Sequence, residues 1–168
     1  MPPRIQLLTK AHNRTAFACG NAALDRYVQT QARQDMQRHL AQVFVLVAED
    51  ETTIQGYYTL SAGSVQLAEL PEELRRTLPR YPKIPVTLLG RLAVDARFQG
   101  QKLGAFLLVD ALYRAVRQTE EIASLAVVVD AIDEAAVAFY RKFHFLPFPE
   151  TPHTLFIEMA TIKQLFRS

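Results

Sequence analysis

The chain has few of the residues that form disulfides and metal clusters. Its 168 residues include a single cysteine, Cys19, so no disulfide can form within the chain. Four scattered histidines and one cysteine do not make up the spaced ligand sets that metal sites use. We therefore expect neither an internal disulfide nor a bound metal.

Long apolar runs are missing as well. No run reaches the roughly 20 residues of a membrane-spanning helix, and the opening M-P-P-R-I-Q-L-L lacks the apolar core of a secretory signal. Hydrophobic residues nevertheless make up 49% of the chain and charged residues 21%, which is typical of globular rather than disordered proteins. We expect one cytoplasmic domain over residues 1–168.

The glycine patterns of the commonest nucleotide sites are also absent. There is no G-x-G-x-x-G, and Lys102 is followed by Leu103 rather than by the Ser or Thr of a P-loop. The chain has instead an apolar segment at 88–94, a polar loop at 97–104 and helical apolar spacing at 103–112. A strand that turns through such a loop into a helix aims free backbone N–H groups at one point. That point suits an anion, typically a phosphate.

The net charge of +2 is unevenly distributed. Residues 74–102 carry +6 and the rest of the chain −4, because seven basic side chains stand there against Asp95 alone. The seven are Arg75, Arg76, Arg80, Lys83, Arg91, Arg97 and Lys102. A basic segment beside a phosphate loop indicates an anionic ligand, with nucleic acid as one candidate. A solvated face without a partner is the alternative.

Apolar periodicity predicts a mixed α/β order of elements. The expected elements are a helix at 22–36, a hairpin of strands at 42–48 and 53–61, an extended segment at 65–70, a helix from 71 to about 78, the central strand–loop–helix unit, a strand at 123–129, a helix at 134–143, a strand at 155–159 and a helical turn at 161–166. Asn21 and Asp133 are the expected helix N-caps. The central strand–helix–strand unit requires parallel strands, and the hairpin requires antiparallel ones.

Two motifs resemble those of the GNAT acyltransferase superfamily. Residues 99–105, Q-G-Q-K-L-G-A, are similar to its coenzyme A diphosphate loop, Q/R-x-x-G-x-G/A, with Lys102 at the first glycine. Lysine resists the positive φ that glycine adopts, but it adds a cation. Residues 133–145 resemble N-x-x-A-x-x-F-Y-x-x-x-G-F, with Asp133 for the Asn and His144 for the last Gly. The resemblance implies the GNAT fold, one mixed and mostly antiparallel sheet with helices on both faces, and acetyl-CoA as co-substrate.

The resemblance also implies site residues. Tyr140 corresponds to the tyrosine that reaches the coenzyme sulfur, where its neutral hydroxyl can protonate the departing thiolate. A tyrosine that only packs its ring is the alternative. The central strand, bulged in this family, would pair with the pantetheine arm and hold the thioester oxygen through one N–H group. The implied coenzyme contacts are Leu92, Ala93, Val94, Gln99, Gly100, Gln101, Lys102, Leu103, Gly104, Ala105, Asp133 and Phe139.

Three further segments narrow the resemblance. F-A-C-G-N-A-A-L-D-R-Y-V, G-Y-Y-T-L-S and Y-P-K-I-P-V-T-L-L-G-R-L-A-V-D look like the acetyltransferase toxins of bacterial toxin–antitoxin pairs. Those toxins acetylate the α-amino group of aminoacyl-tRNA, stop translation, and pair with a ribbon–helix–helix antitoxin that also binds DNA; many are homodimers. The resemblance implies the same partners here. The expected tRNA contacts are Arg75, Arg76, Arg80, Lys83 and Arg91.

The chemistry of the acceptor supports this interpretation. No strong general base stands out near Arg91 or Tyr140 in the sequence. A free α-amine has a pKa near ~7.7–8.0 and a lysine side chain one near ~10.4. A substantial fraction of the α-amine is therefore uncharged and nucleophilic at pH 7, so a site without a base favours α-amines. Two alternatives stay open, an acetyltransferase of a small amine or protein N-terminus and a coenzyme A-binding regulatory module without catalysis. Tyr140 and the basic segment argue against the second.

Overall fold

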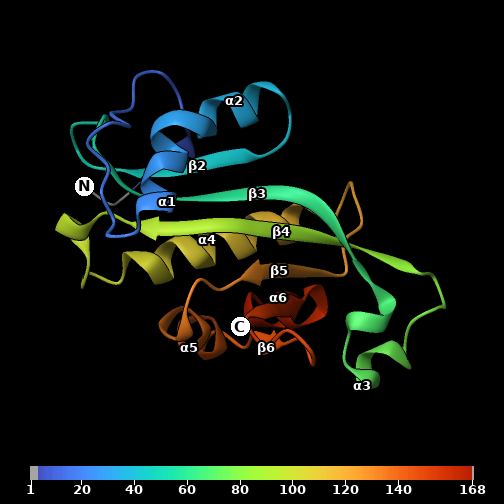
Figure 1. The fold of residues 1–168 in the computed structure, drawn as a ribbon. Coiled ribbons are helices and arrows are strands. Elements are labelled where there is room, and N and C mark those ends of the chain that lie inside the picture. The colour runs from blue at the N-terminus through green and yellow to red at the C-terminus, as the bar shows by residue number, and fades with distance from the viewer. Residues whose placement is uncertain (1–3, 168) are drawn as a thin grey trace. The chain divides into compact units, whose positions relative to one another are not determined.

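The computed structural model describes residues 4–167, which form two compact units (Figure 1). The first unit contains the residues up to Ser61 together with Gly90–Ala111, and the second contains Ala62–Leu89 and the residues from Leu112 onward. Three elements contribute to both units, namely β3 (Ile54–Gln66), β4 (Lys83–Val94) and α4 (Leu103–Gln118). Among residues 4–167, no helix is long and apolar enough to cross a membrane.

The strands hydrogen-bond in the order β1-β2-β3-β4-β5-β7-β6. β4 and β5 (Ala126–Asp130) are parallel, with Thr87 opposite Val127 and Leu89 opposite Val129. β5 is antiparallel to β7 (Thr154–Glu158), and β7 to β6 (Leu146–Pro147). The mixed sheet expected from the sequence is therefore confirmed.

The first unit begins with a helix–hairpin segment. Its elements are β1 (Arg4–Leu7), α1 (Ala22–Arg26), η1 (Tyr27–Gln31), α2 (Ala32–Gln37) and β2 (Gln42–Val47). Asn21 caps α1 as predicted, since its Oδ1 accepts the N–H of Leu24 at 3.1 Å. β2 pairs antiparallel with β1 and with β3, which confirms the hairpin. The predicted helix at 22–36 is correct in extent, but its middle turn, η1, is a π-helix.

Helices cover both faces of β3 in this unit. Tyr57 packs in a core with Tyr27 and Val28 from the helical segment, and with Val43 and Val45 from β2. The neighbouring Gly56 points the other way, because side chains alternate along a strand. A Cβ at Gly56 would lie 2.7 Å from Cδ1 of Leu107, so α4 approaches β3 too closely for any side chain there.

The second unit holds the remaining elements. They are η2 (Leu67–Glu69), α3 (Glu72–Arg75), β5, α5 (Glu134–Lys142), β6, β7 and α6 (Met159–Leu165), together with parts of β3, β4 and α4. The predicted apolar strand at 123–129 is β5, whose residues 126–129 are all buried. Ile84 and Val86 of β4, Val128 of β5 and Phe156 of β7 share one apolar core.

Three predicted boundaries were wrong. The extended segment expected at 65–70 is the end of β3 followed by η2. The central strand begins at Lys83 rather than at 88. Helix α3 ends at Arg75, because the N–H groups of Thr77 and Leu78 turn back to carbonyls only three residues earlier and Pro79 disfavours a helical residue before it.

Two residues adopt a left-handed backbone where the related motifs have glycine. Lys102 has a φ of 62° and His144 a φ of 72°. His144 follows the C-cap of α5, and its N–H bonds to the carbonyl of Arg141 while that of Phe145 bonds to the carbonyl of Tyr140. This is the usual helix termination in which glycine is preferred. The backbone of both motifs is thus retained despite the side chains.

We predict that His144→Gly stabilises the protein. Glycine removes the strain that a Cβ causes at a left-handed backbone. Part of that gain is offset by the greater entropy of the unfolded chain, so the unfolding free energy should rise by about 0.5–1 kcal/mol. Chemical denaturation measures it. The matched control is Arg141→Gly, inside α5, which should destabilise by about 1 kcal/mol. A loss of stability in His144→Gly would show that the His144 side chain makes a stabilising contact.

Candidate active site

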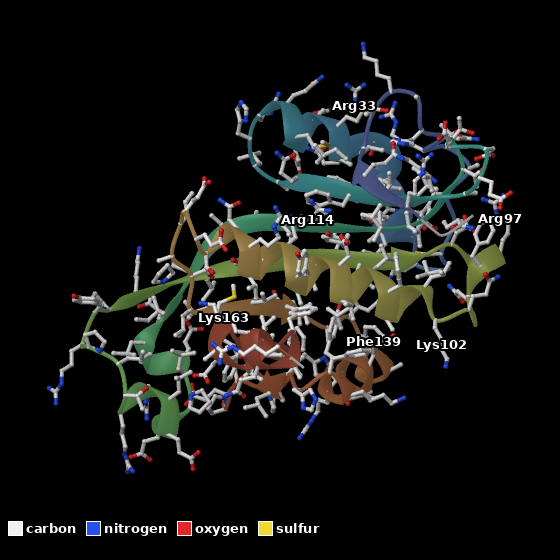
Figure 2. The ribbon with its side chains drawn as sticks, turned by 180° about the vertical axis from the view of Figure 1, so that it is seen from behind. Arg33, Arg97, Lys102, Arg114, Phe139 and Lys163 are labelled. Atoms are coloured by element: carbon white, nitrogen blue, oxygen red, sulfur yellow. The ribbon has the colours of Figure 1, made fainter. Side chains whose placement is uncertain are left out.

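The connection from β4 to α4 presents a row of free backbone donors. It consists of η3 (Ala96–Phe98) and residues 99–102, and Figure 2 shows Arg97 and Lys102 on it. Among residues 4–167, no hydrogen-bond acceptor is found for the backbone N–H groups of residues 99–105. The last of these open a helix of 16 residues, so the helix dipole adds to their partial positive charge. Such a row of free donors suits an anion, and coenzyme binding there stays a prediction.

Asp95 fixes the start of this connection. Its side chain is 1% exposed and accepts the backbone N–H groups of Ala18 at 3.1 Å and Arg97 at 2.9 Å. The Arg97 guanidinium adds Nε at 3.0 Å and Nη2 at 3.2 Å. Burial alone would raise the pKa of Asp95, but these donors outweigh it and hold the pKa below its usual value. Asp95 is therefore an ionised, fully partnered anchor.

The segment at 17–19 braces the same connection. The N–H of Ala96 donates to the carbonyl of Ala18 at 2.8 Å. Nε2 of Gln99 donates to the carbonyls of Cys19 at 3.1 Å and Val94 at 3.0 Å. The Gln99 side chain is thus a structural brace, while its backbone N–H stays available. This bracing positions the donor row before any ligand arrives.

The predicted pantetheine strand is the end of β4. Its pairing with β5 runs from Thr87 to Leu89, and β4 then continues to Val94. Ala93 is buried, and Leu92 and Val94 are partly exposed. The bulge and the N–H group for the thioester oxygen stay predictions.

Tyr140 lies in the second unit with its ring buried. It is 6% exposed, and its ring centroid lies 5.3 Å from those of Phe139 and Phe145. Burial raises the pKa of Tyr140, so its hydroxyl stays protonated throughout the physiological range. Within residues 4–167 the hydroxyl has no hydrogen-bond partner, yet no buried side-chain oxygen lacks one, so this oxygen is not completely enclosed. A packed ring with an unpartnered O–H suits a proton donor.

Asp133 and Phe139 have local roles on α5, which Figure 2 shows with Phe139 labelled. Oδ1 of Asp133 accepts the N–H of Ala136 at 2.8 Å and so caps the helix as predicted. Phe139 packs against Tyr140 and Phe143. These contacts orient α5; coenzyme contact by either residue stays a prediction.

The basic segment is less available than its composition predicts. Arg76 pairs with Glu72 at 2.9 Å, and Nη1 of Arg75 donates to the carbonyl of Ala68 at 3.3 Å. The helix expected from 71 to about 78 would have brought Arg76 and Arg80, four residues apart, onto one face, but α3 ends before either residue. Arg80 and Lys83 are exposed, and neither side chain makes a hydrogen bond or ion pair within residues 4–167. Residues 69–102 contain four acidic and seven basic side chains, so the net charge of this longer segment is +3.

Sequence reasoning missed two residues of this region. Asp95 entered only as the lone acid of a basic segment, although an acid directly after an apolar strand and two residues before an arginine is a signal for a buried anchor. Tyr27 lies in the helix predicted at 22–36, and nothing in that pattern singles it out. In the structure the guanidinium of Arg91 lies over its ring, 3.6 Å from the centroid. No local pattern links residues so far apart in the chain.

We predict that Asp95→Asn destabilises the protein in a pH-dependent way. A depressed pKa contributes stability above the unfolded value of about 4, and this contribution is lost as pH falls through the folded pKa. The difference in unfolding free energy between wild type and variant should therefore be largest near neutral pH and shrink below about pH 4. Denaturation at several pH values measures it. The control Arg97→Gln should lose less unfolding free energy, since Asp95 keeps its two backbone donors. If the difference between wild type and Asp95→Asn did not depend on pH, Asp95 would not be an ionised anchor.

Comparison with known proteins identifies relatives over nearly the whole chain. The family model described as "Acetyltransferase (GNAT) family" matches residues 7–145. "Probable toxin TacT" of Sinorhizobium fredii is 32% identical over 161 residues, which cover 92% of this chain and 89% of the relative. A "tRNA-acetylating toxin" of Mycobacterium tuberculosis is 35% identical over 158 residues, which cover 94% of this chain and 93% of the relative.

Solved structures agree with this. A tyrosine-to-phenylalanine mutant of KacT has a TM-score of 0.93 at 26% identity, covering 99% of this chain and 100% of that one. AtaT complexed with acetyl-methionyl-tRNAfMet has a TM-score of 0.90 at 29% identity, covering 98% and 99%. An AtaT mutant bound to the C-terminus of the antitoxin AtaR and acetyl-CoA has a TM-score of 0.84 at 26% identity, covering 99% of each chain. The predicted family is confirmed, and the chain belongs to the acetyltransferase (GNAT) family.

Proposed function

We propose that this protein is a toxin that uses acetyl-CoA to acetylate the α-amino group of aminoacyl-tRNA and thereby blocks translation. The choice of acceptor rests on the similarity to a tRNA-acetylating toxin, which extends over 94% of the chain. The AtaT complex with acetyl-methionyl-tRNAfMet supports it. The free N–H row at residues 99–105 supports the choice of co-substrate, because it suits a diphosphate.

The residues of this chain fit acetyl-CoA and have definite roles in the transfer. The backbone of residues 99–105 would hold the diphosphate, and the end of β4 would hold the pantetheine arm. Acetyl-CoA supplies an activated acetyl thioester. The acceptor nitrogen forms the new C–N bond as the C–S bond breaks, and the nitrogen loses a proton to solvent. Tyr140 would give its hydroxyl proton to the departing sulfur, because the hydroxyl is protonated at neutral pH and has no other hydrogen-bond partner within residues 4–167.

Partners and location follow from the same proposal. Because AtaT is bound to the C-terminus of AtaR and a KacTA–DNA complex is known, we expect a small DNA-binding antitoxin here. We expect the protein to act in the cytoplasm, where aminoacyl-tRNA is used, and to assemble as a homodimer. One functional domain over residues 1–168 is part of the proposal, although residues 1–3 and 168 lie outside the described part.

Tyr140→Phe tests the proposed chemistry. The variant keeps the ring and its contacts with Phe139 and Phe145 but loses the proton donor, so the acetylation rate of charged tRNA should fall about 10²–10⁴-fold. Calorimetric titration of acetyl-CoA should give an unchanged affinity. Expressed alone in bacteria, the wild type should arrest growth and the variant should not. Near-full acetyl transfer by Tyr140→Phe would make Tyr140 a packing residue only.

Charge reversal of the basic segment tests the acceptor. Arg80→Glu with Lys83→Glu removes two unpaired cations, so KM for aminoacyl-tRNA should rise and should depend less steeply on salt than in the wild type, while KM for acetyl-CoA stays constant. The matched control is Arg76→Gln with Glu72→Gln, which removes an exposed pair of zero net charge and should change neither value. If the double reversal behaves like the control, these side chains are a solvated face.

A further inference from the structure

Arg91 is a fixed guanidinium without an acceptor. It lies on β4, partly exposed, with its guanidinium carbon 3.6 Å from the ring centroid of Tyr27. Within residues 4–167 its side chain makes no hydrogen bond and no ion pair; it contacts the Tyr27 ring, and its charge also acts on Asp35. By contrast, the guanidinium of Arg97 is bound to Asp95. All five N–H donors of Arg91 are therefore available to a ligand.

The ring beneath Arg91 is immobilised from below. Tyr27 is 5% exposed, its hydroxyl donates to Oδ2 of Asp35 at 2.7 Å, and its ring stacks on that of Tyr57 at 6.3 Å with an interplanar angle of 16°. The hydroxyl of Tyr57 donates to the carbonyl of Leu24 at 2.6 Å, and Phe17 meets its ring edge-on at 5.3 Å. These stacked aromatic rings thus hold the Tyr27 ring in place under the guanidinium, which lowers the entropic cost of binding through Arg91.

A π turn supplies this platform. Tyr27 is the first residue of η1. Its carbonyl accepts the N–H of Ala32, five residues later, which is the hydrogen bond of a π-helix. Such turns occur mostly singly within α-helices and often at functional sites. Asp35 lies on α2, the next helical turn, and also accepts Nε2 of Gln31 at 3.0 Å. Hydrogen bonds from Gln31 and Tyr27 and the charge of Arg91 keep the pKa of Asp35 below its usual value, against the opposing effect of its burial.

The chemistry of the free donors favours a phosphate. A planar guanidinium held by stacking presents paired N–H groups that match two oxygens of a phosphate or carboxylate. In aminoacyl-tRNA the carboxylate of the amino acid is esterified, so the anions of the acceptor are its backbone phosphates. The coenzyme diphosphate already has the donors of residues 99–105.

We propose that Arg91 binds a backbone phosphate of the aminoacyl-tRNA and that Tyr27, tied to Asp35, is the positioning residue that fixes its guanidinium. This deepens the proposed function and rests on it. Arg91 then differs in kind from the exposed cations of the basic segment. It acts as one rigid, geometrically specific contact rather than as part of a diffuse positive field.

The experiment measures binding of charged tRNA against salt concentration. Arg91→Gln should weaken binding about tenfold or more and lower the slope of log affinity against log salt by roughly one unit, since one phosphate contact is lost. Arg91→Lys should keep the slope but bind more weakly, because a point charge replaces the planar fork. Acetyl-CoA affinity, measured in the same variants, should be unchanged.

The Tyr27 variants separate positioning from folding. Tyr27→Phe keeps the ring and loses the hydrogen bond to Asp35, so KM for charged tRNA should rise moderately. Tyr27→Leu removes the stacking, so its KM for charged tRNA should approach that of Arg91→Gln. KM for acetyl-CoA should be unchanged in both variants. An unchanged salt slope in Arg91→Gln would overturn the proposal, as would an equal loss of acetyl-CoA affinity, which would assign Arg91 to the coenzyme. A wild type that acetylates no charged tRNA would instead overturn the proposed function.

Discussion

The buried carboxylate of Asp95 is the contact on which the predicted coenzyme loop depends. It receives the N–H groups of Ala18 and Arg97 and the Arg97 guanidinium, so it joins the end of β4, the 17–19 segment and the beginning of the β4–α4 connection. Farther along the connection, the N–H groups of residues 99–105 have no acceptor within the described part of the chain. The chain is fixed on either side of this row, by Asp95 with Gln99 on one side and by α4 on the other, so the donors are held in place for a ligand.

Much of the fold could be predicted because it depends on local periodicity. The apolar run of β5, the hairpin of β2 and β3 and the caps Asn21 and Asp133 each have a signal within a few residues. The errors arose where distant contacts or hydrogen-bond geometry decide. α3 stops early because its last N–H groups bond three residues back, and the π turn at Tyr27 has no signature in the apolar spacing.

The site could be predicted only as far as its motifs are contiguous. The loop at 99–105 and the α5 motif are short segments, and the left-handed φ at Lys102 and His144 explains how both keep their shape without glycine. The braces are not contiguous. Arg91 over Tyr27 and Asp95 with Ala18 join residues more than sixty positions apart, so only the three-dimensional structure pairs them. These contacts also distinguish two arginines that the composition counts alike. Arg97 is paired with Asp95, whereas Arg91 has no ion pair within the described residues.

The most direct measurement follows labelled acetyl groups from acetyl-CoA to a defined acceptor. Purified protein is incubated with the labelled donor and one tRNA in two forms, aminoacylated and uncharged. We predict label only on the charged form, released by mild base as the N-acetylated amino acid, because the amide forms at the α-nitrogen and the ester to tRNA is base-labile. Label on uncharged tRNA, or transfer to lysine side chains of peptides with none to charged tRNA, would contradict the account.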